Sequence, residues 1–179
     1  MVLVRLEELR SFAPDALDAD ASGVQHDMRI AAKRLRYVLE TTELCFGVPA
    51  RLARKRAREL QGLLGEVHDC DVMLSRIERH LAEVRAADAE AVRVRAGEAP
   101  DLDPALAARA PHRTAYRGLD VLAVYVEARR RLLFERFAGL WAEQQAAGDW
   151  ERLEQAAEDA LREASELRGK KARVRVTLA

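Results

Sequence analysis

Residues 26–40 of the chain read HDMRIAAKRLRYVLE. At about 100° per residue, an α-helix places the apolar residues of this stretch on one side and the polar residues opposite them. The apolar side consists of Met28, Ala31, Ala32, Leu35, Val38 and Leu39. The polar side consists of His26, Arg29, Lys33, Arg36, Tyr37 and Glu40. The stretch therefore predicts an amphipathic helix with its apolar side against a core.

The polar side of this helix carries three cations and an imidazole. Like charges three or four residues apart repel each other by roughly a few tenths of a kcal/mol per pair. This repulsion destabilises an isolated helix, and an anion bound to the stripe would relieve it. The pattern predicts an anion-binding surface.

A second basic helix is predicted from Pro49, where the chain continues as RLARKRARELQGLLG over residues 51–65. Its apolar side consists of Leu60, Leu63, Leu64 and Val67. Its other side consists of Arg51, Arg54, Lys55 and Arg58, followed by Gln61, Gly62 and Gly65. Each of these glycines costs about 1 kcal/mol relative to alanine in a helix interior. Close approach of a ligand or of another helix would account for them.

The composition predicts one all-α domain over residues 1–179. Of its 179 residues, 49% are hydrophobic and only 5% aromatic, with nine Gly and five Pro, which is typical of helical proteins. We expect an antiparallel helical bundle with a long core helix. The expected helices cover residues 4–11 (before Pro14), 24–45 (stopped by Gly47), 49–67, 71–96 (capped by Asp69 or Asp71), 114–147 and 150–167. Residues 97–111 are expected to form a loop, and 168–179 a basic, disordered tail.

Charge is distributed unevenly along the chain. The 30 basic and 30 acidic residues balance, which argues against non-specific nucleic-acid binding as the main role. Between His26 and Arg58, however, nine basic residues face three acidic ones, a local charge of +6 against −6 elsewhere. A polyanion is the natural partner of such a region.

Neither a membrane span nor a disulfide framework is predicted. The chain has no run of about 18 apolar residues, and Arg5, Glu7 and Glu8 come too early for a signal-peptide core. The two cysteines, Cys45 and Cys70, form no C-x-x-C pair and are interpreted as small core residues. A cytoplasmic location is expected.

Two motifs in this region resemble those of a known family. They are His26-x-x-Arg29-x-x-x-Lys33-Arg34-Leu35-Arg36-Tyr37-x-x-Glu40 and Leu60-Gln61-x-x-Leu64-Gly65-x-x-x-Asp69-x-Asp71-Val72. They look like the conserved-histidine α-helical domain, CHAD. The resemblance implies a helical bundle whose basic inner surface binds inorganic polyphosphate, and it extends to association with polyphosphate granules. It implies no catalytic residues and no cofactor, so we expect a binding protein rather than an enzyme.

The chain departs from this family in carrying a single copy of the motif pair. Longer members have two bundles related by pseudo-twofold symmetry, and residues 112–117, HRTAYR, are too degenerate to be a second copy. Either half a site suffices or two chains pair. We predict a homodimer, because a twofold pair duplicates the site.

The expected polyphosphate-binding residues are His26, Arg29, Lys33, Arg36, Tyr37, Arg51, Arg54, Lys55, Arg58 and Arg130. Arginine donates two parallel hydrogen bonds to phosphate oxygens, whereas lysine acts as a point charge. A bound polyanion would favour the charged form of His26, and Tyr37 would either contact phosphate or anchor two helices. Arg130 would either line the same cavity or extend to the surface. Glu40 would orient an arginine, while Arg34 and Arg56 are interpreted as solvated charges.

Three other functions are less consistent with these residues. Nucleic acid offers the same phosphates, but base recognition calls for exposed aromatics beside the arginines, and Tyr37 is the only candidate. A metal site at His68, Asp69, Cys70, Asp71 and His80 lacks persuasive spacing, and residues 68–71 are better explained as a turn and helix cap. A triphosphate hydrolase would need Mg²⁺ ligands, and the basic stripes contain only Glu40.

Overall fold

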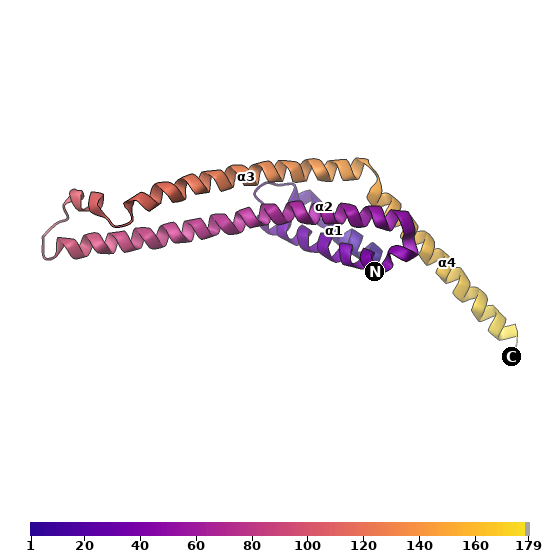
Figure 1. The fold of residues 1–179 in the computed structure, drawn as a ribbon. Helices are drawn as coiled ribbons and strands as arrows, with labels where there is room; N and C mark the ends of the chain where they lie inside the picture. Colours follow the sequence, from indigo (N-terminus) through magenta and orange to yellow (C-terminus); the bar gives the residue numbers. More distant parts are fainter. Residues whose placement is uncertain (178–179) are drawn as a thin grey trace. The chain divides into compact units, whose positions relative to one another are not determined.

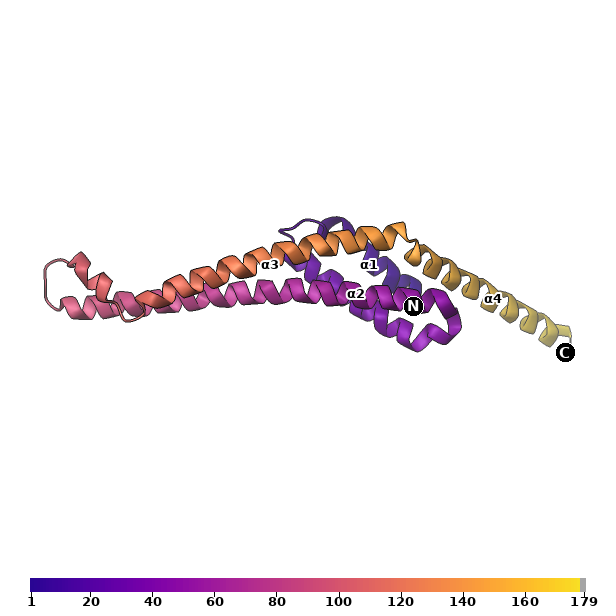
Figure 2. The same ribbon diagram turned by 45° about the horizontal axis from the view of Figure 1, so that its top comes forward.

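The computed structural model describes the backbone of residues 1–177 and the side chains of residues 1–168, and all its regular elements are helical. In chain order these are α1 (Val2–Ala16), α2 (Ser22–Ala96), the 3₁₀ helix η1 (Pro104–Arg109), α3 (Arg113–Ala146) and α4 (Asp149–Thr177) (Figures 1 and 2). The predicted all-α helical bundle is confirmed. The side chains of the predicted tail beyond Arg168 lie outside the described residues.

The chain forms two compact units, the first comprising residues 1–66 and the chain from Leu133 onward. In this unit α1 contacts α4, and the core contains residues from the predicted apolar sides of both basic helices, among them Leu35 and Leu39 from the first and Leu60 and Leu64 from the second. Its largest fully buried side chains are Leu6, Leu9, Met28, Leu35, Leu39, Leu60, Leu64, Phe137, Gln144, Trp150 and Leu153. Burial of one such Leu or Phe contributes about 1.5–3 kcal/mol. The amphipathic periodicity thus determines the core.

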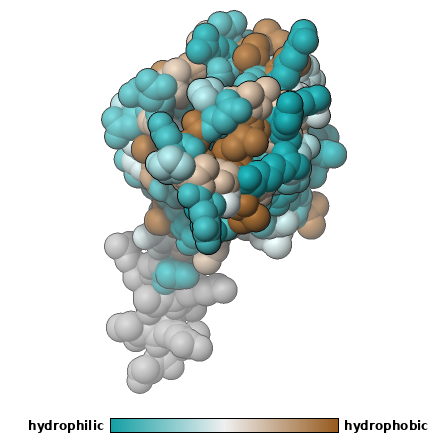
Figure 3. Space-filling view, turned by 90° about the vertical axis from the view of Figure 1, so that its left-hand side faces the viewer, coloured by the Kyte–Doolittle hydropathy of each residue, from teal (hydrophilic) through white to brown (hydrophobic). Residues whose placement is uncertain are grey.

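The second unit, residues 67–132, is a hairpin in which the end of α2 runs antiparallel to the beginning of α3 (Figure 1). Val67, Cys70, Ile77, Val84 and Val126 are buried in it. The face of the molecule that Figure 3 shows is mainly hydrophilic, with hydrophobic patches between the polar groups.

Asp88 connects α2 to the start of α3 within this hairpin. Its carboxylate accepts a hydrogen bond from the backbone N–H of His112 at 3.1 Å and one from the Tyr116 hydroxyl at 2.6 Å. His112 Nδ1 lies 2.8 Å from the same carboxylate. Burial by itself raises the pKa of Asp88, but the hydrogen bonds from Tyr116 and His112 bring this pKa below its usual value. Residues 112–117 therefore serve to fix this helix junction.

The predicted break at Gly47 is confirmed. Gly47 has φ 61° and ψ −130° in the middle of α2, so α2 consists of two helical segments, 22–46 and 48–96, that meet at a sharp bend. A residue with a Cβ is strained in this conformation, whereas glycine adopts it freely. Pro49 lies in the first turn of the second segment, where a missing backbone N–H has no cost.

Two predicted helix boundaries are wrong. The first helix continues through Pro14 to Ala16, because Ala13 and Ala16 are buried and hold its last turn in place. The break predicted at residues 68–71 does not exist, and α2 is continuous there. No Gly or Pro occurs between Gly65 and Gly97, so nothing in the backbone chemistry forces the helix to end.

Two predicted core side chains are exposed. Cys45 lies on the surface beside the bend, whereas Cys70 is buried as expected. Leu122, assigned to the core stripe of α3, is also exposed, although Val126, Leu133, Phe137 and Trp141 of that stripe are buried.

Candidate anion-binding site

A pocket of about 330 Å³ lies where the two basic segments of α2 meet. It is lined by Arg36, Glu40, Arg51, Leu52, Arg54, Lys55 and Arg58, and we call it the basic pocket. Five of these seven residues are cations and one is a carboxylate. The bend at Gly47 brings residues 36 and 40 opposite residues 51–58, so five of the ten predicted binding residues surround one cavity.

Arg36 is the most firmly held cation of the basic pocket. Its Nε donates to Gln61 Oε1 at 3.0 Å, and its Nη1 pairs with Glu40 one turn along the helix. Its guanidinium also stacks over the Tyr37 ring, 4.3 Å from the ring centroid, and Lys33 Nζ lies 6.0 Å from the same centroid. The expected orienting role of Glu40 is confirmed. Tyr37 acts on the site through its ring, which supports Arg36.

Glu43 joins two other arginines of the basic pocket. Its two carboxylate oxygens lie 3.2 Å from Arg51 Nε and 2.9 Å from Arg54 Nε. Lys55 is 3.8 Å from Glu59, and Arg58 has no ion pair with any described residue. The expectation that Glu40 is the only carboxylate among the basic stripes is therefore wrong. The i,i+4 spacing of Lys55 and Glu59 was a usable signal, whereas the Glu43 contacts depend on the bend.

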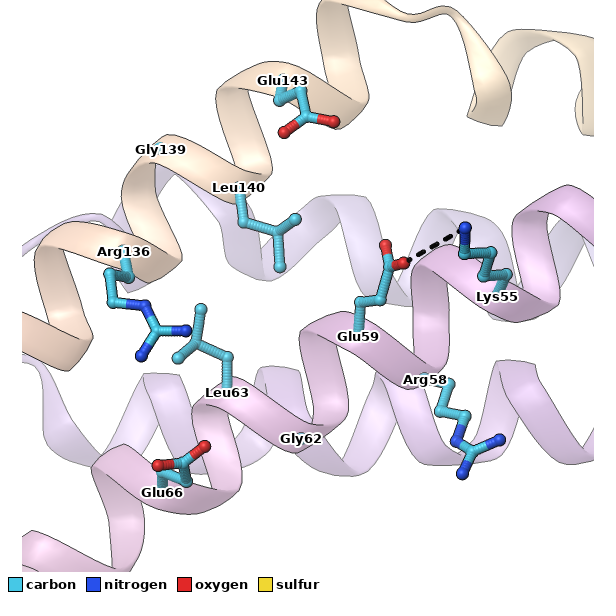
Figure 4. A pocket seen from close by; sticks show the side chains of 10 residues that line it. All are labelled: Lys55, Arg58, Glu59, Gly62, Leu63, Glu66, Arg136, Gly139, Leu140 and Glu143. Atoms are coloured by element: carbon cyan, nitrogen blue, oxygen red, sulfur yellow. Dashed lines mark ion pairs between the residues drawn. The ribbon is translucent and has the colours of Figure 1, made fainter.

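A larger pocket of about 750 Å³ lies between α2 and α3 in the first unit. It is lined by Lys55, Arg58, Glu59, Gly62, Leu63, Glu66, Arg136, Gly139, Leu140 and Glu143 (Figure 4), and we call it the mixed-charge pocket. Leu63 and Leu140 point toward one another across it, whereas the Arg58 guanidinium points away from α3 (Figure 4). It shares Lys55 and Arg58 with the basic pocket, but its three carboxylates offset its three cations.

The family model described as the CHAD domain matches residues 1–178. The chain belongs to the CHAD family. No curated protein and no solved structure matches it.

The two unexplained glycines of the CHAD motif region have different environments. A Cβ added to Gly65 would lie 3.4 Å from Arg29 Nε, which is an ordinary contact distance. No atom lies within 4 Å of a Cβ added to Gly62, which opens onto the mixed-charge pocket. Arg29 is therefore the neighbour of Gly65, but the packing at neither position requires glycine.

Arg29 and His26 of this CHAD domain are half-buried and do not line the basic pocket. Arg29 Nε is buried without a hydrogen-bond partner among the described residues. Lys33 is exposed on the same helix and lies beside the Tyr37 ring. These three residues extend the positive surface along the first segment of α2.

Arg130 belongs to the second unit, where its guanidinium pairs with Asp71. The neighbouring Arg129 contacts the Cys70 sulfur at 3.4 Å. The structure therefore assigns Arg130 an ion pair within the hairpin.

The interpretation of Arg34 and Arg56 as simply solvated charges is wrong. Arg34 pairs with Glu8 of α1 at 2.6 Å. Arg56 Nε donates to the buried Asp149 at the start of α4 at 2.8 Å, and Arg56 also contacts Glu59 and Glu143. Both arginines connect helices, and their partners on other helices, Glu8, Glu143 and Asp149, lie too far along the chain for helical periodicity to identify them.

Neither a metal site nor a membrane span is found in the part of the CHAD domain that the structure describes. No group of three or more His, Cys, Asp or Glu side chains there is placed to hold a metal ion. None of the described helices is long and apolar enough to cross a membrane.

Replacing Glu43 by glutamine is expected to raise the affinity of the basic pocket for an anion by roughly threefold at low salt, because it removes a negative charge beside Arg51 and Arg54, two of the cations that line the pocket. The glutamine oxygen can still accept the hydrogen bond that Arg51 Nε donates to Glu43. Fluorescence titration with long-chain polyphosphate measures the change, and Glu158→Gln, at an exposed position of α4, is the charge-matched control. Weaker binding by the Glu43 variant alone would show that positioning of the arginines outweighs repulsion.

Proposed function

We propose that this CHAD domain binds inorganic polyphosphate in the basic pocket. The observation that carries the proposal is the convergence of Arg36, Arg51, Arg54, Lys55 and Arg58 on one small cavity. Polyphosphate offers about one negative charge per phosphorus and no other group for recognition, so its receptor needs charge density and hydrogen-bond donors. Four arginines provide forked donors with the geometry of phosphate oxygens.

The ion pairs around the basic pocket suit a ligand whose phosphate groups can replace Glu40 and Glu43 as partners of the arginines. Glu40 and Glu43 hold Arg36, Arg51 and Arg54 near the cavity before a ligand arrives. A polyanion then replaces single carboxylate contacts with several phosphate contacts along one chain. Each charge-assisted hydrogen bond contributes about 1.5–3 kcal/mol, and linked contacts reinforce each other.

Polyphosphate fits the pocket better than nucleic acid does. The aromatic ring next to the pocket, Tyr37, is covered on one face by the Arg36 guanidinium, so a base cannot stack on that face. The cavity of about 330 Å³ suits a thin, unbranched phosphate chain. The family to which the chain belongs is associated with polyphosphate.

We further propose that the domain binds without catalysing a reaction. Phosphoryl transfer to water needs carboxylates free to hold Mg²⁺ beside the phosphates. Glu40 and Glu43, the carboxylates at the basic pocket, are instead engaged with arginines. Phosphate release from polyphosphate in the presence of Mg²⁺ would contradict this proposal.

The decisive experiment is a titration with long-chain polyphosphate at one fixed salt concentration, because phosphate binding weakens steeply with salt. Tripolyphosphate, single-stranded DNA and duplex DNA serve as competitors. We expect long polyphosphate to compete far better than either DNA at equal phosphate concentration. Equal competition by DNA would show a general anionic surface and overturn the assignment.

A further inference from the structure

Helix α3 has a second apolar stripe, which is largely exposed to solvent. Val126 is buried in the hairpin, whereas Val121, Tyr125 and Leu132 expose 63%, 63% and 56% of their surface, and Ala128 is also exposed. We call these four exposed residues the outer stripe. Their spacing of four, three and four residues places them within about 60° of one another around the helix.

This arrangement is typical of a helix that packs against another helix. Single exposed apolar residues are ordinary on protein surfaces, but an aligned row of them marks an interaction site. Alternating steps of three and four residues form the seam of a coiled coil. Val124 and Leu122, exposed on either side of the outer stripe, widen the apolar surface.

We propose that the outer stripe is a dimer interface, in which α3 packs antiparallel against α3 of a second copy of this chain. A twofold axis between residues 126 and 127 places Val121 opposite the partner's Leu132. It also places Tyr125 opposite the partner's Ala128, so the largest side chain of the stripe meets the smallest. The stripe is therefore complementary to itself, as an isologous interface requires.

Charges beside the outer stripe also favour a second copy of the chain packed in the antiparallel orientation. Asp120 lies near one end of the stripe and Arg131 near the other, and both are exposed without an ion pair to a described residue. The antiparallel arrangement brings Asp120 beside the partner's Arg131, and the twofold axis repeats the pair. A parallel arrangement would separate Asp120 from the partner's Arg131 by about three helical turns, so this charge pair would not form.

The size of the stripe sets the strength of the dimer. Four exposed side chains bury on the order of 400 Å² per copy, about half of the roughly 800 Å² per partner in a standard interface. We therefore expect a reversible dimer that dissociates in the micromolar range. The inference does not rest on polyphosphate binding, although a dimer would supply two basic pockets from a chain with one copy of the motif pair.

Sedimentation equilibrium without polyphosphate tests the interface. We expect the full chain to dimerise with rising micromolar concentration and Tyr125→Glu and Leu132→Glu to remain monomeric. Val4→Glu and Leu161→Glu, at similarly exposed positions on α1 and α4, should dimerise normally. Circular dichroism confirms folding of each variant. A monomeric parent chain, or a dimer indifferent to both stripe variants, would overturn the proposal.

Cross-linking tests the orientation. In a Cys45→Ser background, which removes the exposed native thiol, Val121→Cys and Leu132→Cys chains are treated with a short thiol-reactive linker. The antiparallel interface predicts rapid cross-linking when the two variants are mixed and little when either is alone. Efficient cross-linking of each variant with itself would show a parallel arrangement and contradict the proposal.

Discussion

Replacing Arg36 and Arg58 together by alanine is expected to weaken binding of long-chain polyphosphate at least tenfold. The two guanidinium groups come from different segments of α2 and line the same basic pocket. Each charge-assisted bond contributes about 1.5–3 kcal/mol, so losing two such donors exceeds the roughly 1.4 kcal/mol that corresponds to tenfold. The dependence of log Kd on log salt should also become shallower by about one per lost contact.

The control for this double variant removes two arginines elsewhere. Arg93 and Arg162 are exposed and paired with Glu90 and Asp159, so their double alanine variant has the same net charge. Arg58→Ala alone tests the pocket without disturbing the Gln61 and Glu40 contacts of Arg36. Equal weakening by the control pair would mean that net charge, rather than the basic pocket, determines binding.

Replacing Asp149 by alanine is expected to lower the free energy of unfolding by about 3 kcal/mol, because it leaves the partly buried Arg56 without its main partner. Asp149 is only 4% exposed and pairs with both Arg56 and Arg152. Urea denaturation followed by circular dichroism measures the loss. Asp159→Ala, which removes an exposed ion pair, should change stability little, and an equal loss there would contradict the argument.

The contribution of the Asp149 carboxylate to stability is expected to depend on pH. Burial alone raises the pKa of Asp149, but hydrogen bonds from Arg56 and Arg152 lower this pKa below its usual value. The pKa of an aspartate in the unfolded chain is about 3.9. Because the pKa of Asp149 is lower in the folded chain, its carboxylate stabilises the fold above about pH 3.9, and this stabilisation is lost as the pH falls through the folded-state pKa. The difference in stability between the parent chain and Asp149→Ala should therefore shrink below pH 4.

Much of the fold follows from periodicity. The apolar side of residues 26–40 gave Met28, Leu35 and Leu39 correctly as buried residues, because a helix's repeat depends only on local geometry. The bend at Gly47 was predictable from glycine and proline chemistry. Pro14 was misleading because buried alanines keep its helix intact, and Asp69 and Asp71 were misleading because a helix interior tolerates aspartates that face solvent or an arginine.

The candidate site was predicted less completely. Helical wheels placed Arg51, Arg54, Lys55 and Arg58 on one side, and the structure places them around the same pocket as Arg36. A wheel describes one helix at a time, so it did not show that Glu43 would reach Arg51 and Arg54 across the bend. It also gave no means of linking Arg56 to Asp149, 93 residues away. Contacts between elements depend on how the chain packs.

Because of the bend at Gly47, the basic pocket is formed by residues that are close together in the sequence. Every residue that lines it lies between positions 36 and 58, so the pocket can form without the packing of a segment that is distant in the sequence. The loop-closure cost is small for so short a separation, and the pocket can form early in folding. A single contiguous stretch of coding sequence therefore carries the pocket, which makes it a natural unit for transfer into another helical scaffold.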